Sequence, residues 1–268
     1  MVKKRADIYL VERGIVDSRE KAKRLIDEGK VFSNGRLIVK PSTLLEDGSI
    51  IKVEERPPYV SRGGLKLEKA IHFFGIDVSG KKAIDVGVGT GGFTDCLLKH
   101  GAECVLAVDV GYGQVAWSIR NDPRVFLLER TNIRDLKASD VPFRADMATV
   151  DLSFISVKKV IDVLKDLVKP GGELVILVKP QFEAGRDRVG KKGIVRDPSI
   201  HEGVLAQMVD FLEGFGMSVS GLTHSPIKGA EGNIEFLMYG AFEPVKTKVN
   251  WSGKIKEVVK EAHRELGG

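Results

Sequence analysis

The stretch Asp85-Val-Gly-Val-Gly-Thr-Gly-Gly-Phe-Thr94 determines how the central part of this 268-residue sequence is expected to fold. A short apolar run precedes it, and an apolar helical segment beginning at Cys96 follows it. A strand that ends in glycines and turns into a helix brings its backbone close to a ligand and directs amide N–H groups at it. Asp109 closes the next apolar run, about twenty residues on, where a carboxylate can hold ribose hydroxyls. The stretch therefore predicts a site for a nucleoside-containing cofactor.

The glycine pattern alone leaves the cofactor open. Gly87, Gly89 and Gly92 satisfy G-x-G-x-x-G, the dinucleotide fingerprint, so an NAD-dependent oxidoreductase is one alternative. Asp85 ends the strand just before the glycines, where a carboxylate repels a pyrophosphate but attracts the sulfonium and ammonium groups of S-adenosylmethionine. The segment resembles D-x-G-x-G-x-G, the pattern of class I methyltransferases. This resemblance favours S-adenosylmethionine as the cofactor over NAD, and over glycines that serve only a tight turn.

Composition narrows the class of protein. The formal charge of +5 and the pI of about 9.0 are compatible with nucleic-acid binding. No apolar run reaches the length of a membrane span, and the charged N-terminus lacks the apolar segment of a signal peptide, so we expect a cytoplasmic protein without stable membrane association. Cys96, His100 and Cys104 are spaced by four, but they fall on a helix and the next strand. We interpret the cysteines as buried thiols and expect no metal.

Residues 1–53 predict a small α+β unit. A face of the second helix is basic, with Arg19, Lys23 and Arg24 opposite Ala22 and Ile26. The expected elements are helices over residues 5–13 and 19–28, a hairpin at Asn34-Gly35 over 31–39, and a strand over 49–53. The motifs R-x-D-x-x-L, S-R-E-K-A-K-R-L-I-x-x-G-K-V and N-G resemble the alpha-L RNA-binding domain typified by a small-subunit ribosomal protein. The resemblance implies that Arg19, Lys23 and Arg24 contact RNA phosphates.

A proline-containing linker over residues 54–60 separates this unit from a larger domain expected over 61–244. Residues 245–268 predict a terminal amphipathic helix. Helices and strands alternate in the larger domain, which predicts an α/β fold with a largely parallel sheet. The expected strands cover residues 83–86, 104–109, 124–129, 147–152, 173–178, 217–222 and 234–242. A turn-rich segment before the last strand favours antiparallel pairing there, as in the Rossmann-like seven-stranded sheet of class I methyltransferases.

Polar residues at strand ends are the candidates for chemistry. Asp151 and Lys179 close the fourth and fifth strands, where open α/β sheets bind their ligands. Glu235 begins the antiparallel last strand and so reaches the same edge, and Lys66 lies near the start of a helix that can also reach it. Burial disfavours a charged ammonium group, so a lysine that closes an apolar strand is a candidate base. Two lysines and two acids at one cleft fit the alkylation of an alcohol, which needs a base and good positioning.

Lys66, Asp151, Lys179 and Glu235 match the Lys-Asp-Lys-Glu tetrad of the FtsJ-like RNA 2'-O-methyltransferases. Together with S-R-G-x-x-K-L, D-L-S-F-I-S, V-K-P-Q-F-E and K-G-I-V-R-D, the sequence resembles the TlyA haemolysin and ribosomal RNA methyltransferase family. The resemblance implies methylation of a ribose 2'-hydroxyl, that of cytidine, in ribosomal RNA or ribosomal subunits. It makes Lys179 the base, which Asp151 and Lys66 orient, with Glu235 completing the network.

The same resemblance assigns the cofactor site. Gly87, Gly89 and Gly91 are expected to line it, with Asp85 near the methionine end. Asp109 is expected at the ribose and Asn132 beside the adenine.

A glycine-punctuated basic segment follows the fifth strand. Its cations are expected to clamp RNA phosphates, so that their replacement weakens RNA binding and its salt dependence. These residues are Arg186, Arg188, Lys191 and Lys192. Because the family is also named for haemolysins, a membrane-active haemolysin is a further alternative. The sequence contains no strongly amphipathic apolar helix that would support it.

Overall fold

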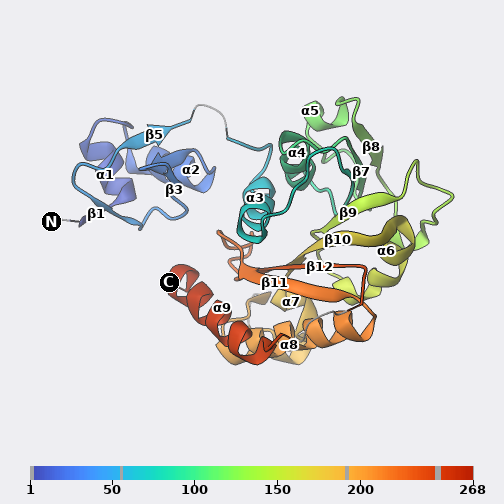
Figure 1. The fold of residues 1–268 in the computed structure, drawn as a ribbon. Coiled ribbons are helices and arrows are strands. Elements are labelled where there is room, and N and C mark those ends of the chain that lie inside the picture. Colours follow the sequence, from blue (N-terminus) through green and yellow to red (C-terminus); the bar gives the residue numbers. More distant parts are fainter. Residues whose placement is uncertain (1–2, 55–56, 191–192, 245–248, 268) are drawn as a thin grey trace.

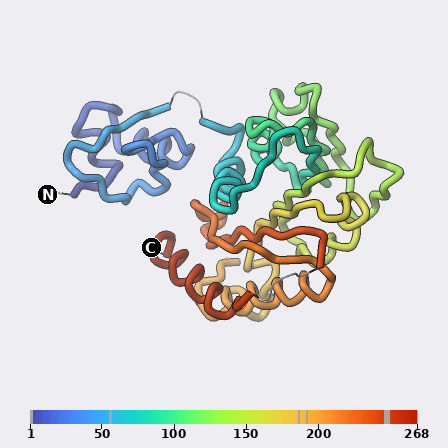
Figure 2. The backbone as a smooth tube through the Cα atoms, viewed as in Figure 1, coloured from blue at the N-terminus to red at the C-terminus, as the bar shows by residue number. Residues whose placement is uncertain are grey.

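The computed structural model describes residues 3–54, 57–190, 193–244 and 249–267. An N-terminal unit occupies one side of the molecule and the chain after residue 57 forms the other (Figure 1; Figure 2). The N-terminal unit consists of β1 (Lys3–Arg5), α1 (Ala6–Glu12), α2 (Arg19–Asp27), β2 (Val31–Ser33), β3 (Arg36–Leu37), β4 (Leu44–Glu46) and β5 (Ile51–Val53). The two predicted helices and the predicted hairpin are confirmed.

Local sequence explains these elements. The Ser18 hydroxyl accepts a hydrogen bond from the Lys21 N–H at 3.2 Å and so caps the start of α2. Asn34 and Gly35 have φ angles of 50° and 77°, the left-handed conformation that a two-residue hairpin turn requires. The pairing of β1 with β4 was not predicted. The exposed charged residues of β1 carry no apolar alternation, so nothing in their pattern indicates a strand.

The second unit is built on a seven-stranded sheet in the order β11-β12-β10-β9-β6-β7-β8. The strands are β6 (Lys82–Val86), β7 (Cys104–Val108), β8 (Val125–Leu128), β9 (Ala145–Val150), β10 (Val168–Val178), β11 (Ser218–His224) and β12 (Phe236–Ala241). Strand β12 is antiparallel to both of its neighbours, β10 and β11, whereas β10, β9, β6, β7 and β8 pair in parallel. The predicted seven strands and the antiparallel last strand are confirmed.

The register of β12 brings its start to the carboxyl ends of its neighbours. Val178 at the end of β10 pairs with Phe236 at the start of β12, and Ile176 pairs with Val150 near the end of β9. The residues that follow these strand ends, or precede β12, therefore meet at one edge of the sheet. Strand β10 begins earlier than the predicted fifth strand, and its pairing with β9 has a register irregularity between Val168 and Glu173.

Helices cover both faces of the sheet (Figure 1). The α-helices are α3 (Gly63–Phe74), α4 (Gly92–Lys99), α5 (Trp117–Arg120), α6 (Ile161–Leu167), α7 (Pro180–Glu183), α8 (Pro198–Gly214) and α9 (Trp251–Leu266). Short 3-10 turns are η1 (Ile133–Asp135), η2 (Val157–Lys159) and η3 (Arg186–Arg188). Alternate strand residues face opposite sides, so Val105 packs under α3 and α4 while Leu106 packs toward α6, α8 and α9.

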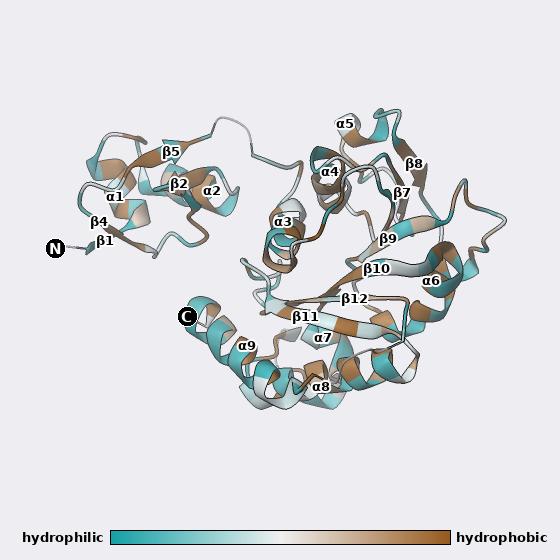
Figure 3. Cartoon of the chain, viewed as in Figure 1, coloured by the Kyte–Doolittle hydropathy of each residue, from teal (hydrophilic) through white to brown (hydrophobic). Residues whose placement is uncertain are grey.

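Helices α8 and α9 carry both hydrophobic and hydrophilic residues, as Figure 3 shows. The predicted apolar stripe of the terminal helix is confirmed, with Ile255, Val258, Ala262 and Leu266 buried in the core that covers the sheet. Within the predicted linker, Tyr59 is buried in the core shared by α3 and α4. The chain is therefore already anchored on the second unit at this residue.

Candidate active site

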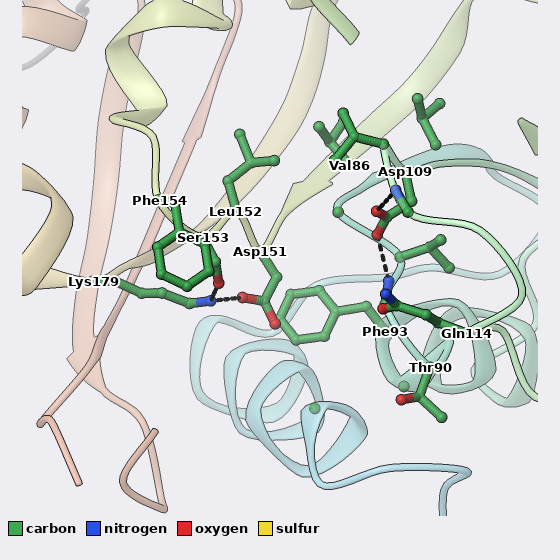
Figure 4. Close-up of a pocket in the computed structure, with 18 of the residues that line it drawn as sticks. Val86, Thr90, Phe93, Asp109, Gln114, Asp151, Leu152, Ser153, Phe154 and Lys179 are labelled. Carbon is green, nitrogen blue, oxygen red and sulfur yellow. Dashed lines mark hydrogen bonds and ion pairs between the residues drawn. The ribbon is translucent and has the colours of Figure 1, made fainter. Parts of the chain in front are cut away.

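A cavity of about 790 Å³ lies at the carboxyl edge of the parallel strands. Its walls come from the glycine loop after β6, the loop after β7, the ends of β9 and β10, and the start of α3. Figure 4 shows several lining side chains with the ion pair at one end and Asp109 at the other. A cavity of this size and position can hold a nucleoside cofactor together with part of a second substrate.

Backbone geometry explains the need for glycine in the loop. Gly87 has a φ angle of +90°, and a Cβ atom there would collide with the carbonyl oxygen of Asp151. Gly89 has a φ angle of +52° and lines the cavity with Gly87. Gly91, which was also predicted to line the site, is not among the lining residues. It precedes α4 with a φ angle of +98° and faces Ile119, so its role is in the turn itself.

Asp85, which was expected near the methionine end of the cofactor, lies beneath the cavity. Its side chain is fully buried and is not part of the cavity wall. The Thr94 hydroxyl donates to Oδ2 at 2.6 Å and the Thr149 hydroxyl donates to Oδ1 at 3.0 Å. Burial raises the pKa of Asp85 to about 7, against the two hydroxyl hydrogen bonds, which lower it. The carboxyl group therefore ties β6 to α4 and β9 beneath the cavity.

Asp109 and Asn132, which were expected at the ribose and the adenine of the cofactor, both line the cavity. The Asp109 carboxylate accepts the Gly89 N–H at 2.8 Å on Oδ2 and the Gly111 N–H at 2.7 Å on Oδ1. These two bonds fix the carboxylate at the end of β7, next to the glycine loop. The Asn132 side-chain Oδ1 accepts the Arg134 N–H at 3.2 Å and caps η1.

The predicted tetrad separates into two ion pairs. The Lys179 Nζ lies 2.7 Å from the Asp151 Oδ1 and donates a hydrogen bond of 2.9 Å to the Ser153 hydroxyl (Figure 4). The Lys66 Nζ donates to the Glu235 Oε2 at 2.6 Å. Lys66, Asp151 and Lys179 line the cavity, whereas Glu235 lies behind Lys66 with only 3% of its side chain exposed.

Ser153 and Phe154 also line the cavity, although they were not singled out from the sequence as site residues. Ser153 binds the Lys179 ammonium group, and Phe154 is 91% exposed with a φ angle of +64°. The motif D-L-S-F contains both residues, but only its first residue had a recognisable chemical role. An exposed aromatic side chain on a strained backbone beside an ion pair is a signal that appears only in the folded chain.

The predicted RNA-binding residues of α2 are all exposed. Arg19, however, forms an ion pair of 2.8 Å with the buried Asp7, which Arg5 also binds. Hydrogen bonds from Arg5, and then from Arg19, lower the pKa of Asp7 to about 2. Arg19 therefore has a structural contact that Lys23 and Arg24 do not share.

The basic segment after β10 is described only in part. Arg186 and Arg188 lie on η3, and Arg188 is exposed. Lys191 and Lys192 lie outside the described residues.

Comparison with known proteins identifies this arrangement. Residues 59–242 match the FtsJ-like methyltransferase family and residues 4–51 match the S4 domain family. The chain belongs to the FtsJ-like methyltransferase family. Membership confirms the expected enzyme class, with S-adenosylmethionine as its cofactor, and removes the support for an NAD-dependent oxidoreductase.

Relatives of this FtsJ-like protein extend over nearly its whole length. "Putative rRNA methyltransferase YqxC" of Bacillus subtilis is 47% identical over 277 residues, which cover 98% of this chain and 95% of the relative. The "16S/23S rRNA (cytidine-2'-O)-methyltransferase TlyA" of Mycobacterium tuberculosis is 39% identical, covering 98% and 97%. A structure titled "Putative hemolysin from Streptococcus thermophilus" is 43% identical with a TM-score of 0.76, covering 100% of this chain and 98% of that one.

The residues present fit S-adenosylmethionine. The glycine loop leaves room for a ligand against its backbone, and the fixed Asp109 carboxylate is a suitable acceptor for ribose hydroxyls. The lysine–carboxylate pairs lie at the other end of the same cavity. None of the helices among the described residues is both long and apolar enough to cross a membrane.

Proposed function

We propose that this protein transfers a methyl group from S-adenosylmethionine to the ribose 2'-hydroxyl of a cytidine in ribosomal RNA. The observation that carries the proposal is the pairing of Lys179 with Asp151 at 2.7 Å in the wall of the cofactor cavity. A relative that covers almost the whole chain bears the name of this reaction. The S4 match at residues 4–51 supports RNA as the partner. Ribosomal RNA as substrate also supports a cytoplasmic location.

The proposed chemistry assigns a task to each pair. Bound S-adenosylmethionine supplies an electrophilic methyl group on a positively charged sulfur. Lys179, in its neutral form, accepts the 2'-hydroxyl proton as the new O–CH₃ bond forms and the S–CH₃ bond breaks. Asp151 and Ser153 hold the amine in place, and Asp151 stabilises the ammonium group that results. The leaving group is the neutral thioether.

Lys66 is proposed to orient the acceptor ribose by donating hydrogen bonds into the cavity. Glu235 holds Lys66 from behind, and its near-complete burial keeps it away from the substrate. Such positioning supplies much of the rate in a displacement reaction. Glu235 is therefore a positioning residue for Lys66.

The experiment is methyl transfer from labelled S-adenosylmethionine to ribosomal subunits that lack the modification, followed by mapping of the product. Lys179→Ala is expected to abolish transfer. Lys256→Ala, which removes an exposed lysine on α9, serves as the matched control and is expected to retain it. A methyl group found on a base atom would refute the ribose assignment.

Binding measurements separate the two halves of the proposal. Lys179→Ala is expected to bind S-adenosylmethionine and RNA as the unmodified protein does. Loss of cofactor binding in this variant would show that Lys179 acts in binding and not as the base.

A further inference from the structure

One cluster of potential metal ligands lies outside the methyltransferase cavity. Glu68 and His72 on α3 and His100 at the end of α4 each offer one ligand atom, and these atoms lie within 4.8 Å of one another. None of the three residues lines the cavity. We propose that Glu68, His72 and His100 bind a divalent transition-metal ion of the Zn²⁺ type. This site is independent of the proposed methyl transfer.

This cluster cannot be recognised from the sequence because its members come from two helices. Along the chain, His100 has Cys96 and Cys104 as neighbours, and their spacing did not support a metal site. Glu68 and His72 are four residues apart, so they share one face of α3. Packing of α3 on α4 brings His100 to that face, with its ring 5.7 Å from the His72 ring at an angle of 69°.

In two of the proposed ligands, the side-chain atom that would not bind the metal is held by a hydrogen bond. The His100 Nδ1 lies 2.9 Å from the carbonyl oxygen of Cys96, which can only accept, so Nδ1 carries the proton and Nε2 presents its lone pair. The Tyr59 hydroxyl donates to the Glu68 Oε1 at 2.8 Å, and within the described residues no hydrogen bond occupies the Oε2 atom, which can bind a cation. Metal-binding histidines and carboxylates in proteins are usually held by such outer contacts.

Charge near the cluster is compatible with a cation. The Lys99 ammonium group is bound by the Asp95 carboxylate at 3.0 Å and by the carbonyl oxygen of Pro58 at 2.6 Å. Two imidazole nitrogens and one carboxylate oxygen form the donor set of open zinc sites, in which water completes a tetrahedron. Imidazole also selects Co²⁺, Ni²⁺ and Cu²⁺ over Mg²⁺ and Ca²⁺.

A second group of ligand atoms provides an internal comparison. His224, Glu261 and Glu265 also lie within reach of one another. There the Lys69 ammonium group lies 3.3 Å from the His224 Nε2 and 3.4 Å from Nδ1, so it opposes a cation at this position. The cluster on α3 and α4 is therefore the better site.

The test uses the untagged full-length chain, stripped with chelator and titrated with Zn²⁺ by calorimetry and with Co²⁺ by visible absorption. One equivalent of each metal is expected to bind, with the strong absorption of tetrahedral Co²⁺. His72→Ala and His100→Ala are expected to weaken binding by at least about tenfold. Glu265→Gln, in the comparison group, is expected to bind as the unmodified protein does.

The variants also allow a control for folding, because His72 is exposed. Metal-free His72→Ala is expected to have the melting temperature of the metal-free unmodified protein. Added Zn²⁺ is expected to raise the melting temperature of the unmodified protein and not that of His72→Ala. Absence of binding at micromolar metal would overturn the proposal, as would equal affinity in His72→Ala, His100→Ala and the unmodified chain. Loss of binding in Glu265→Gln alone would place the ion at the other group and would overturn it too.

Discussion

Lys66 and Glu235, which are 169 positions apart in the sequence, form an ion pair of 2.6 Å that is almost fully buried. Lys66 comes from α3 on one face of the sheet, and Glu235 comes from the residue before β12. The pair therefore joins the first helix of the catalytic unit to its last strand. It also fixes Lys66 at the cavity wall.

We expect Lys66→Met to destabilise the protein by about 3 kcal/mol, because it leaves the Glu235 carboxylate buried without its partner. The double variant Lys66→Met with Glu235→Gln is expected to recover most of this loss while remaining inactive. Urea unfolding of the two single variants and the double variant measures the coupling. Strictly additive losses would show that the ion pair contributes nothing to stability.

The buried Asp85 makes the stability of the fold depend on pH. Burial raises the pKa of this carboxyl group from 3.8 to about 7 in the folded protein. The folded state therefore holds the proton more tightly than the unfolded state, and this group lowers the free energy of unfolding as the pH rises through that interval.

Asp85→Asn is expected to remove the contribution of this group to the pH dependence of the free energy of unfolding, since the amide stays neutral at every pH. Between about pH 5 and about pH 8, the free energy of unfolding should fall by about 3 kcal/mol more in the unmodified protein than in the variant. Denaturant unfolding at both pH values measures the difference. Asp210→Asn on α8 removes an exposed carboxylate as the control, and it should follow the unmodified protein. Equal pH dependence in Asp85→Asn would contradict the expectation.

The meeting of the candidate site residues could be predicted because strand ends in an open α/β sheet share one edge, whatever the details of packing. Asp151, Lys179 and Glu235 follow from that rule together with the antiparallel last strand. This rule does not predict the direction in which a side chain at a strand end points. Asp85 faces Thr94 and Thr149 under the cavity, and this orientation depends on contacts between three elements. The sequence pattern carries no information on such contacts.

The same limit applies to Arg19. A basic helix face predicts exposure, and the exposure is observed. Its ion pair with Asp7 depends on how α1 packs on α2, which periodicity does not specify. Likewise the meeting of His72 with His100 depends on the packing of α3 on α4.

These contacts separate the expected roles of two basic residues in the S4 domain. Arg19→Ala is expected to lower the free energy of unfolding by about 1 kcal/mol, because the buried Asp7 loses one of its two arginine partners. Lys23→Ala is expected to leave stability unchanged within about 0.5 kcal/mol. Its affinity for ribosomal RNA should fall, with a decrease of about one in the salt slope. Filter binding at several salt concentrations measures the slope, and an unchanged slope for Lys23→Ala would remove it from the RNA-binding surface.

Phe154 is expected to contact the nucleotide that carries the acceptor hydroxyl. Its ring is 91% exposed and lines the cavity with Asp151 and Lys179 (Figure 4). The Phe182 ring supports it, with the two ring centroids 5.2 Å apart. Stacking of a base on an aromatic ring contributes about 1–3 kcal/mol. Phe154→Ala should therefore reduce methyl transfer to ribosomal RNA by roughly tenfold or more, with S-adenosylmethionine affinity unchanged.

The backbone of Phe154 supplies the control for this prediction. A φ angle of +64° is strained for phenylalanine and unstrained for glycine, so Phe154→Gly should stabilise the protein by about 1 kcal/mol while it loses activity as Phe154→Ala does. Phe73→Ala removes another exposed aromatic ring, at 59% exposure on α3 and outside the cavity, and should retain activity. Single-turnover transfer and thermal unfolding of the three variants measure both quantities. Full activity in Phe154→Gly would show that the exposed ring serves neither RNA binding nor catalysis.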